Sequence, residues 1–368
     1  MRILLTSNAS YAPARGGSTR SNLVWLRHLA EHNHQCRVVC ASLDGDSDDT
    51  VDGIRIHSVK NLVQRRTVLD NHIHQFQPDF VLMSSEDLSH LLLAETARAA
   101  PDKLVYLAHT PQFFPFGPES WNPSLRATAI IRTARAVVAI GKSAADYIER
   151  ATGVRAAVIH PPIYGHPPFA RPGCFDYGSV LMINPCQVKG VGIFLELARR
   201  FPEVAFQGLA GWGTSSDDRR EMARLPNVQI IESVGNIEEA LSQARILLMP
   251  SLWYEGFGLI AMEAMLRSIP VISSDSGGLV EARQGTGFVI PVRRIERYLP
   301  EFDETHMPRP VIPEQNLEPW TEALASLLSD RALYEAESER CRAAALSFVA
   351  KLDASDFEKF LVSLGATD

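Results

Sequence analysis

Residues 250–265 read PSLWYEGFGLIAMEAM, and this stretch carries the strongest structural signal in the chain. It places Glu255 in a tight turn with Gly256 and Gly258, begins a helical pattern directly afterwards, and puts Glu263 two turns along that helix. The first N–H groups of a helix have no partner within it and lie at the positive end of its dipole, so they can hold a phosphate. Carboxylates on either side can accept hydrogen bonds from sugar hydroxyls. The spacing favours a ligand with a central diphosphate and a sugar at each end, although a well-capped amphipathic helix also explains these carboxylates.

Short apolar runs alternate with helical patterns on both sides of this stretch, which is typical of a parallel sheet covered by helices. Strands are predicted at residues 3–6, 37–41, 54–57, 80–83, 104–108, 136–139 and 157–160, and again at 180–183, 205–209, 228–231, 246–249, 271–273 and 288–290. Residues 291–315 read as irregular, and helices are expected at 318–328, 332–350 and 354–364.

The chain has 368 residues, more than one core usually covers, and a proline-rich run at 161–168 interrupts the alternation. Dense proline forbids a helix and favours an extended connector. We therefore predict an α/β protein with two doubly wound, Rossmann-like domains, residues 1–164 and 165–350. Ligands of such sheets bind at the carboxyl ends of the strands, which predicts a site in the cleft between the two domains.

Composition narrows the class of protein. The chain is 46% hydrophobic and 21% charged, as in globular proteins, and its net charge of −7 argues against a nucleic-acid partner. No apolar run approaches the length of a membrane span, and residues 1–7 read as a first strand followed by a polar turn, so a cytoplasmic location is expected. The five cysteines include no CxxC pair, which predicts buried thiols without a disulfide framework or a zinc site.

Two further turns between a strand and a helix are candidate phosphate sites. Gly16 and Gly17 let the backbone come close to an anion, although a plain strand-to-helix turn is the simpler interpretation. Lys189 precedes Gly190 at the start of a predicted helix, where an ammonium group can meet a phosphate. A solvated lysine is an equally good interpretation of that position.

One histidine and one acidic cluster complete the candidates. His109 lies just past a strand end, where a histidine can act as a general acid or base or contact a substrate. The other histidines read as core or surface residues. The acidic residues between Asp44 and Asp49 look like a metal cluster, but charge runs in loops are usually solvated, so no metal site is expected there.

Taken together, these segments strongly resemble glycosyltransferase family 4, whose members are retaining enzymes with the GT-B fold. The resemblance covers nearly the whole chain and is densest between residues 226 and 291. It rests on Gly16-Gly17, Lys189-Gly190, Pro250-Ser251, Glu255-Gly256-Phe257-Gly258, Glu263-Ala264-Met265, Pro270-Val271, Gly277-Gly278 and Glu281. It implies an acceptor-side first domain, a nucleotide-sugar-binding second domain, and a C-terminal helix in residues 351–368 that packs back on the first domain.

The resemblance also implies roles for individual residues. Lys189 would neutralise the donor phosphates, Glu255 would face the donor sugar and the reacting centre, and His109 would lie near the sugar and the acceptor. Donor contacts are expected at Gly16, Gly17, Asn184, Gly258, Leu259, Ile260 and Glu263, the last of these to the ribose hydroxyls. Because the cations are on the protein, no metal and no cofactor are expected.

Asn184 departs from the family pattern, since members usually carry an arginine five residues before the lysine. One phosphate cation is therefore missing or comes from elsewhere, with Arg15 and Arg20 as candidates. The predicted function is retaining transfer of a hexose from a nucleotide sugar, UDP-glucose as the best guess, to a hydroxyl acceptor in polysaccharide, glycolipid or natural-product biosynthesis.

Two alternatives stay open. One is a nucleotide-sugar epimerase on the same fold, and the other is a non-catalytic subunit that binds sugar nucleotides. The long aromatic loop at 109–121 is expected on the acceptor side, although a packed surface loop explains it equally well. The loop is compatible with peripheral membrane contact, but no strongly basic amphipathic helix supports such contact.

Overall fold

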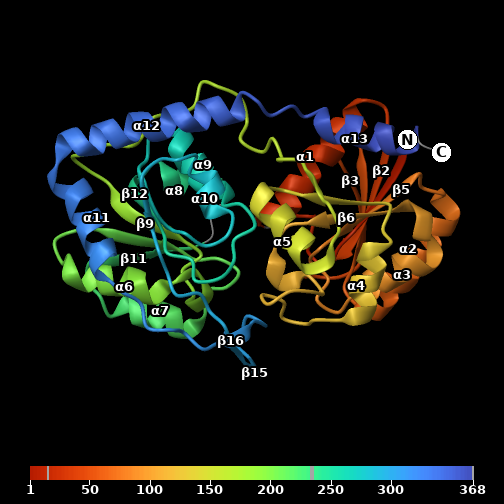
Figure 1. Cartoon of the computed structure of the whole chain (residues 1–368), viewed down its shortest axis with the longest axis horizontal. Helices are drawn as coiled ribbons and strands as arrows, with labels where there is room; N and C mark the ends of the chain where they lie inside the picture. Colours follow the sequence, from red (N-terminus) through yellow and green to blue (C-terminus); the bar gives the residue numbers. More distant parts are fainter. Residues whose placement is uncertain (15, 233–235, 367–368) are drawn as a thin grey trace. The chain divides into compact units, whose positions relative to one another are not determined.

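The computed structural model describes residues 1–14, 16–232 and 236–366. The chain divides into two compact units, of which the first contains Met1–Gly165 and the C-terminal segment from Leu352, and the second contains His166–Lys351. The division falls one residue from the expected boundary at 164, and the last helix belongs with the first unit (Figure 1). Each unit is an α/β domain built on its own sheet, which confirms the predicted fold class.

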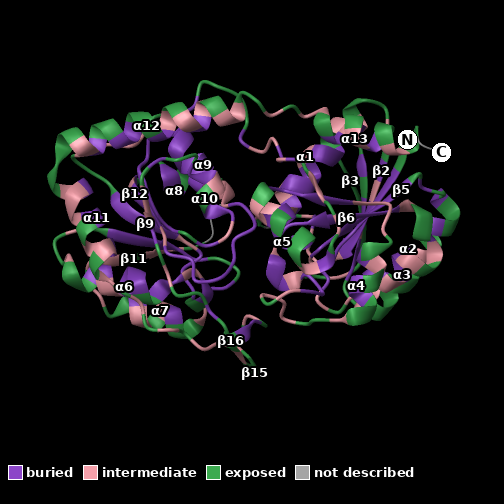
Figure 2. Ribbon diagram, in the orientation of Figure 1, coloured by how far each residue is buried: buried purple, intermediate pink, exposed green. Residues whose placement is uncertain are grey.

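The described residues of the first unit form an eight-stranded sheet with the order β3-β4-β2-β1-β5-β6-β7-β8. All its strand pairs are parallel except β3 with β4. The central strands are buried along almost their whole length, because helices cover both faces (Figure 2). The strands are β1 (Arg2–Thr6), β2 (Gln35–Ala41), β3 (Ser47–Val51), β4 (Ile54–Val59), β5 (Phe80–Ser84), β6 (Leu104–Ala108), β7 (Ala136–Ala139) and β8 (Ala157–Val158).

The first unit also contains six α-helices in its described residues. They are α1 (Gly17–Glu31), α2 (Leu62–Phe76), α3 (Leu91–Ala99), α4 (Leu125–Arg132), α5 (Lys142–Thr152) and α13 (Asp356–Gly365), with short 3-10 turns η1 (Pro101–Lys103) and η2 (Pro111–Phe113). The C-terminal α13 docks on α1, where Phe357 stacks on Trp25 with ring centroids 4.6 Å apart. Both rings are buried, so this contact anchors the end of the chain on the first unit.

The second unit has a six-stranded sheet in its described residues, with the order β11-β10-β9-β12-β13-β14 and all pairs parallel. The chain starts in the middle at β9, runs outward through β10 and β11, and then returns to β12 on the other side of β9. This reversal is the switch point at which such sheets bind ligands. The strands are β9 (Ser179–Ile183), β10 (Phe206–Leu209), β11 (Val228–Ile231), β12 (Ala244–Met249), β13 (Val271–Ser274) and β14 (Phe288–Ile290).

The helical elements of the second unit are η3 (Gln187–Lys189), α6 (Val191–Arg200), α7 (Ser216–Ala223), α8 (Glu238–Leu241), α9 (Leu259–Leu266), α10 (Leu279–Ala282), α11 (Glu318–Ser329) and α12 (Arg331–Val349). The central helix α9 is buried by α12, whose Phe348 stacks on Phe257 with ring centroids 5.6 Å apart. Arg342 of α12 also donates a hydrogen bond to the carbonyl oxygen of Leu266 at the end of α9. No helix of the described residues has both the length and the hydropathy of a membrane span.

Two segments differ from the sequence expectation. Part of the acidic loop forms β3, an edge strand that pairs antiparallel with β4 and is exposed at every position. Residues 291–315 also contain a small antiparallel pair, β15 (Tyr298–Phe302) with β16 (Pro308–Pro310). β3 and β15 have no buried residue, and β16 buries only Pro308, so apolar alternation could not reveal them. Within β3, Asp48 forms an ion pair with Arg55 of the neighbouring strand, which fits the solvated cluster expected there.

Candidate functional site

Three loops meet at the carboxyl edge of the second sheet, following β9, β12 and β13. The backbone N–H groups of Leu252 and Trp253 both donate to the carbonyl oxygen of Val188, at 3.0 and 3.2 Å. Glu255 forms a parallel bridge with Gly277, and the N–H of Gly278 donates to the Glu255 carbonyl at 2.8 Å. These bonds fix the three loops to one another at the switch point of the sheet.

Lys189 is held at this edge by an unusual local backbone. It ends the single turn η3, and the next residue, Gly190, has a φ of +81°. A Cβ atom at Gly190 would lie 2.1 Å from the carbonyl oxygen of Pro250, so only glycine fits between the two loops. The Lys189 ammonium lies 2.5 Å from Glu255 Oε1 and 4.1 Å from the centroid of the Trp253 ring.

Glu255 is the other member of this ion pair, and the side chains of both residues are mostly buried. Its side chain is 11% exposed and that of Lys189 is 16% exposed, so solvent screens their attraction only weakly. The hydroxyl of Ser251, itself buried, donates to the same carboxylate oxygen. The carboxylate is thus oriented by two donors, and the ammonium is held between a carboxylate and an aromatic face.

The segment from Gly258 to Glu263 forms the start of α9. Gly258 has a φ of +104°, and no side chain caps the helix, so the first-turn N–H groups of Leu259 and Ile260 lie at an uncapped helix start. Glu263 lies in the second turn and is only 4% exposed. The predicted residues Lys189, Glu255, Gly258, Leu259, Ile260 and Glu263 therefore converge on one edge of one sheet.

Asn184 belongs to the same edge, directly after β9. Its φ of +54° is left-handed, and its Oδ1 accepts hydrogen bonds from the N–H of Gly213 at 2.9 Å and from the hydroxyl of Thr214 at 3.4 Å. Its Nδ2 is buried and has no partner among the described residues. A buried donor without a partner is costly in a finished core, so this amide is a candidate contact for a bound ligand.

Sequence reasoning missed the aromatic part of this site. Trp212, in the loop after β10, is 53% exposed, and its ring lies 5.6 Å from that of Trp253. Only its position after a strand could have indicated it, because a single tryptophan in a glycine-rich loop forms no recognisable motif. Trp253 itself is only 4% exposed, so Trp212 is the indole of this pair that lies open to a ligand.

His109 lies in the first unit, directly after β6, and is 2% exposed. The amide nitrogen of Asn22 donates to Tyr11 and Ser84, so its oxygen accepts the proton on His109 Nε2, at 2.9 Å. The Nδ1 atom then carries a lone pair, and it is buried without a partner among the described residues. Burial lowers the pKa of His109, which favours the neutral ring that can accept a proton.

Gly16 and Gly17 stand at the start of α1 in the same unit. Gly16 has a φ of +91°, and no side chain caps the helix, so the backbone there is open to an anion. Of the two arginines considered as substitute cations, Arg15 lies outside the described residues, and Arg20 belongs to the first turn of α1. His109, Gly16 and Gly17 thus belong to one unit, and the seven other predicted residues belong to the second.

A pocket of about 600 Å³ opens at the carboxyl edge of the first sheet. Its lining comes from the loops after β1, β5 and β6 and from Leu62 at the start of α2, and it includes Asn8, Glu86, Leu88 and Phe113. The aromatic loop expected on the acceptor side contributes Phe113 to the pocket. Phe114 and Phe116 are instead buried, and Phe114 packs against Tyr106 in the core. The loop therefore serves the core as well as the pocket.

Comparison with known families now assigns the chain. Residues 15–164 match the family model described as Glycosyltransferase Family 4, and residues 179–306 match that described as Glycosyl transferases group 1. The chain belongs to the family 4-like glycosyltransferases of the GT-B fold. A comparison with curated proteins gives no match. The resemblance expected from the sequence is thus confirmed, and this glycosyltransferase has one family model on each of its two units.

Solved structures agree with this fold. The glycosyltransferase superposes on a sucrose-phosphate synthase from Thermosynechococcus elongatus with a TM-score of 0.78 at 15% identity, over 100% of both chains. Anabaena Alr3699/HepE in complex with UDP-glucose gives 0.71 at 15% identity, again over 100% of both chains. WaaG, a glycosyltransferase involved in lipopolysaccharide biosynthesis, gives 0.69 at 16% identity over 99% of both. At sequence identities of 15–16%, this structural similarity shows that the proteins share a fold.

Proposed function

We propose that this glycosyltransferase transfers a hexose from a nucleoside diphosphate sugar to a hydroxyl group, with retention of configuration. The observation that carries the proposal is the Lys189–Glu255 pair beside the uncapped start of α9. A diphosphate suits the ammonium and the free N–H groups, and sugars suit the carboxylates around them. UDP-glucose is the first candidate donor, because HepE of the same fold has been solved with it.

Donor binding divides among the residues of the second unit. Lys189 and the N–H groups of Leu259 and Ile260 would bind the diphosphate, and Glu263 would accept hydrogen bonds from the ribose. Glu255 would accept hydrogen bonds from the hexose hydroxyls. Asn184 stands where the family usually carries a cation, and its unpaired Nδ2 would supply one hydrogen bond in place of a charge.

The chemical step concentrates negative charge on the departing diphosphate. The C–O bond between the sugar and the diphosphate breaks, and an acceptor oxygen bonds to the same carbon from the same face. The departing phosphate oxygen takes the acceptor proton. Lys189 and the helix-start N–H groups stabilise this charge more in the transition state than in the bound donor, which lowers the barrier. All of these charges come from the protein, so the proposed step needs no metal.

The first unit would contribute the acceptor side. His109 has a neutral ring with a lone pair on Nδ1, which can accept a hydrogen bond from a hydroxyl of the sugar or of the acceptor. The pocket of about 600 Å³ beside it is the candidate acceptor site, and it combines apolar walls with the carboxylate of Glu86. Such a lining fits a saccharide attached to an apolar group, as in a glycolipid or a natural product, and also the end of a polysaccharide.

A donor screen tests the proposal. UDP-, GDP- and ADP-sugars are compared by thermal shift, because a ligand of the folded state raises the melting temperature by mass action. The donor that binds is then incubated with saccharide, glycolipid and aglycone acceptors, and the anomeric configuration of the product is read by NMR. A product with the anomeric configuration of the donor supports the proposal, and an inverted product overturns the retaining mechanism.

A second function is favoured by one observation, the amide of Asn184 where the family usually carries a cation. A chain with weakened phosphate neutralisation could bind sugar nucleotides as a subunit without transferring the sugar. Slow hydrolysis of the bound donor by the purified chain separates the two, because a transferase releases free sugar and nucleoside diphosphate when water replaces the acceptor. Tight binding with no hydrolysis and no transfer would favour the binding subunit.

A further inference from the structure

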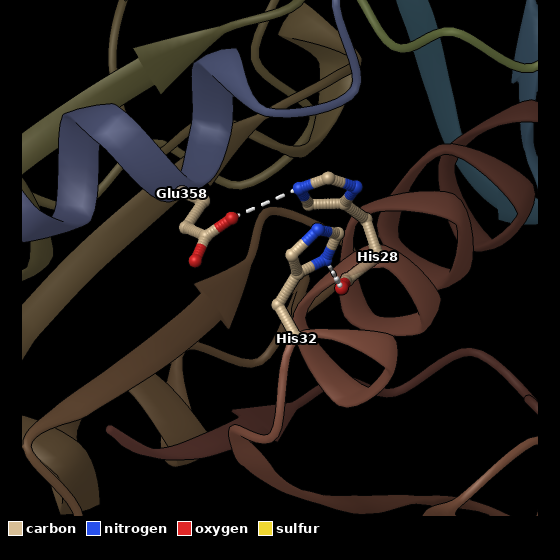
Figure 3. A group of neighbouring side chains, drawn as sticks. All are labelled: His28, His32 and Glu358. Atoms are coloured by element: carbon tan, nitrogen blue, oxygen red, sulfur yellow. Dashed lines mark hydrogen bonds and ion pairs between the residues drawn. The ribbon is translucent and has the colours of Figure 1, made fainter.

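Two histidines and a glutamate form a cluster on the first unit, outside the candidate transferase site. His28 and His32 lie one turn apart near the end of α1, and their ring centroids are 4.1 Å apart. Glu358 reaches them from α13, with Oε2 2.9 Å from His28 Nε2 (Figure 3). One ligand atom from each of the three residues lies within 4.8 Å of the others. The cluster thus joins two helices that are 330 residues apart in the chain.

The hydrogen bonds around the cluster fix which nitrogen of His32 carries a proton. His32 Nδ1 lies 2.7 Å from the backbone oxygen of His28, which only accepts, so Nδ1 carries the proton. In the neutral ring, the lone pair of His32 then lies on Nε2. Figure 3 shows the two imidazole rings side by side, facing the carboxylate from the same helix.

A third histidine orients the carboxylate. The N-terminal ammonium, which only donates, lies 2.8 Å from His34 Nδ1, so that nitrogen accepts and His34 Nε2 carries the proton. His34 Nε2 then donates to Glu358 Oε1 at 2.8 Å. This bond fixes the orientation of the Glu358 carboxylate. Its other oxygen, Oε2, remains directed at His28.

We propose that His28, His32 and Glu358 bind a divalent transition-metal ion, with Zn²⁺ the best fit. Two imidazoles and one carboxylate are a ligand set that zinc accepts, with water in the fourth position. The ion would take the place of the hydrogen between His28 Nε2 and Glu358 Oε2, and the neutral His28 ring would then carry its proton on Nδ1. Tetrahedral zinc sets its ligand atoms roughly 3.4 Å apart, given bonds of about 2.0–2.1 Å. The three ligand atoms now lie within 4.8 Å of one another, and a rotation of the exposed His32 side chain would bring them closer.

Outer contacts distinguish this cluster from an ordinary surface ion pair. Metal-binding histidines usually donate their other N–H to a carbonyl or carboxylate, and metal-binding carboxylates are themselves hydrogen-bonded. His32 already has such a carbonyl partner, and Glu358 already has the His34 donor. The Glu358 carboxylate is therefore oriented before an ion arrives, and the His32 tautomer leaves Nε2 as its ligand atom.

Bound metal would fasten α13 to α1. In the described residues α13 already contacts the first unit through the Trp25–Phe357 stack, the His34–Glu358 hydrogen bond, and Arg135, which donates to the carbonyl oxygen of Leu364. A coordinated ion adds a bridge across these two helices and raises the stability of the first unit by mass action. The role is structural, so it stands apart from the proposed transfer chemistry.

The test uses the untagged full chain after EDTA treatment and removal of the chelator. Calorimetric titration with Zn²⁺ is expected to show one equivalent bound, with a rise in the melting temperature. His32→Ala is the first variant, because the side chain is exposed and bonds only its own helix, so folding should be unaffected. It should bind Zn²⁺ at least tenfold more weakly, and His34→Gln should lose roughly 10–100-fold through the outer contact.

The matched control is His166→Ala, an exposed histidine of the second unit, which should bind like the unaltered protein. Glu358→Gln tests the third ligand, and far-UV circular dichroism without metal verifies that each variant is folded. Co²⁺ substitution adds a spectroscopic readout, since a tetrahedral site with nitrogen ligands gives visible absorption that His32→Ala should lose. Equal Zn²⁺ affinity in the unaltered protein and His32→Ala, or no binding by either, would overturn the proposal.

Discussion

The ammonium nitrogen of Lys189 lies 2.5 Å from a carboxylate oxygen of Glu255, although the two residues follow different strands of the second sheet. The pair is mostly buried, and the face of Trp253 covers the ammonium at 4.1 Å. Lys189 is therefore oriented before any ligand arrives. A bound diphosphate would compete with Glu255 for the ammonium and would leave the carboxylate free to accept hydrogen bonds from sugar hydroxyls.

Replacement of Lys189 by alanine should remove the charge that stabilises the departing diphosphate. The expected result is a fall in kcat that corresponds to about 2–4 kcal/mol of barrier, as for the loss of a preorganised donor to developing charge. Steady-state transfer assays measure it, with exposed Lys351→Ala as the control for loss of a lysine. A near-normal kcat in Lys189→Ala would remove Lys189 from the catalytic step.

Gly190 should tolerate no side chain. Its φ is +81°, and an added Cβ would lie 2.1 Å from the Pro250 carbonyl oxygen, so Gly190→Ala must push the two loops apart. We expect a loss of about 2 kcal/mol or more in the free energy of unfolding, together with weaker donor binding. Urea unfolding and donor titration measure the two effects.

Gly192 provides the matched control two residues later. It is exposed in α6 and would place a new Cβ in open space, so Gly192→Ala should stabilise by about 0.5–1 kcal/mol. If both variants behaved alike, the close approach of the two loops would not be what fixes Lys189.

Asn184→Asp tests the role of the unpaired amide. The substitution keeps the oxygen that accepts from Gly213 and Thr214, but it replaces the Nδ2 donor with a second oxygen. A carboxylate beside the proposed diphosphate should weaken donor binding at least tenfold, because like charges then face each other. Isothermal titration with the nucleoside diphosphate measures it. Unchanged affinity would show that Nδ2 faces no phosphate.

Much of this architecture could be predicted because its signals are local. The apolar strands, the turn at Gly258 and the Lys189-Gly190 step each follow from neighbouring residues in the chain. The helical pattern predicted directly after the turn at Gly258 is α9, which begins at Leu259. By contrast, β3 has every residue exposed, so its pairing with β4 is stabilised by a backbone ladder that leaves no apolar pattern.

The features that the sequence did not predict depend on contacts between residues that are far apart in the chain. Trp212 meets Trp253 only because β10 and β12 both flank β9, and Glu358 meets His28 only because α13 returns to α1. His28 and His32 were interpreted as ordinary core or surface histidines, because Glu358, which joins their cluster, lies near the other end of the chain. Single-sequence patterns contain no information on such contacts.

Acid should weaken the first unit through His72 of α2. Burial is the largest cause that lowers the pKa of His72 to about 4, followed by His57, Arg37 and Arg55, with Asp48 acting in the opposite direction. The folded state therefore binds fewer protons than the unfolded chain, whose histidine pKa is about 6.5. The stability contribution is complete above pH 6.5 and is lost as the pH falls toward 4. Hydrogen exchange of the α2 amides between pH 7 and pH 4.5 should reveal increasing exposure.

His72→Gln should reduce that pH dependence, since glutamine has no proton to gain. His109, whose pKa is also lowered by burial, would leave some dependence in place. Exposed His166→Gln is the control and should leave the α2 profile unchanged. An α2 exchange profile that does not respond to pH in the unaltered protein would contradict the assignment.

Glu337 and Arg283 form a completely buried pair in the second unit, each with no exposed surface. Glu337 Oε1 lies 3.7 Å from Arg283 Nη2 and accepts from the Cys341 thiol at 3.1 Å, while Arg340 donates to the other oxygen. Burial lowers the pKa of Arg283, which shows how unfavourable an isolated charge would be there. The pair joins α12 to the turn before β14, so it fastens the C-terminal helix of this unit to the sheet.

Glu337→Gln should therefore destabilise the second unit by about 3–5 kcal/mol, because it leaves the Arg283 guanidinium buried without a counter-charge. The double replacement Arg283→Met with Glu337→Met removes both charges. It should lower the free energy of unfolding less than Glu337→Gln alone, because apolar side chains have no charge to desolvate. Urea unfolding, together with hydrogen exchange of the α12 amides, locates the effect in this unit. Equal losses in the single and double variants would show that packing, and not the charge, determines stability at this position.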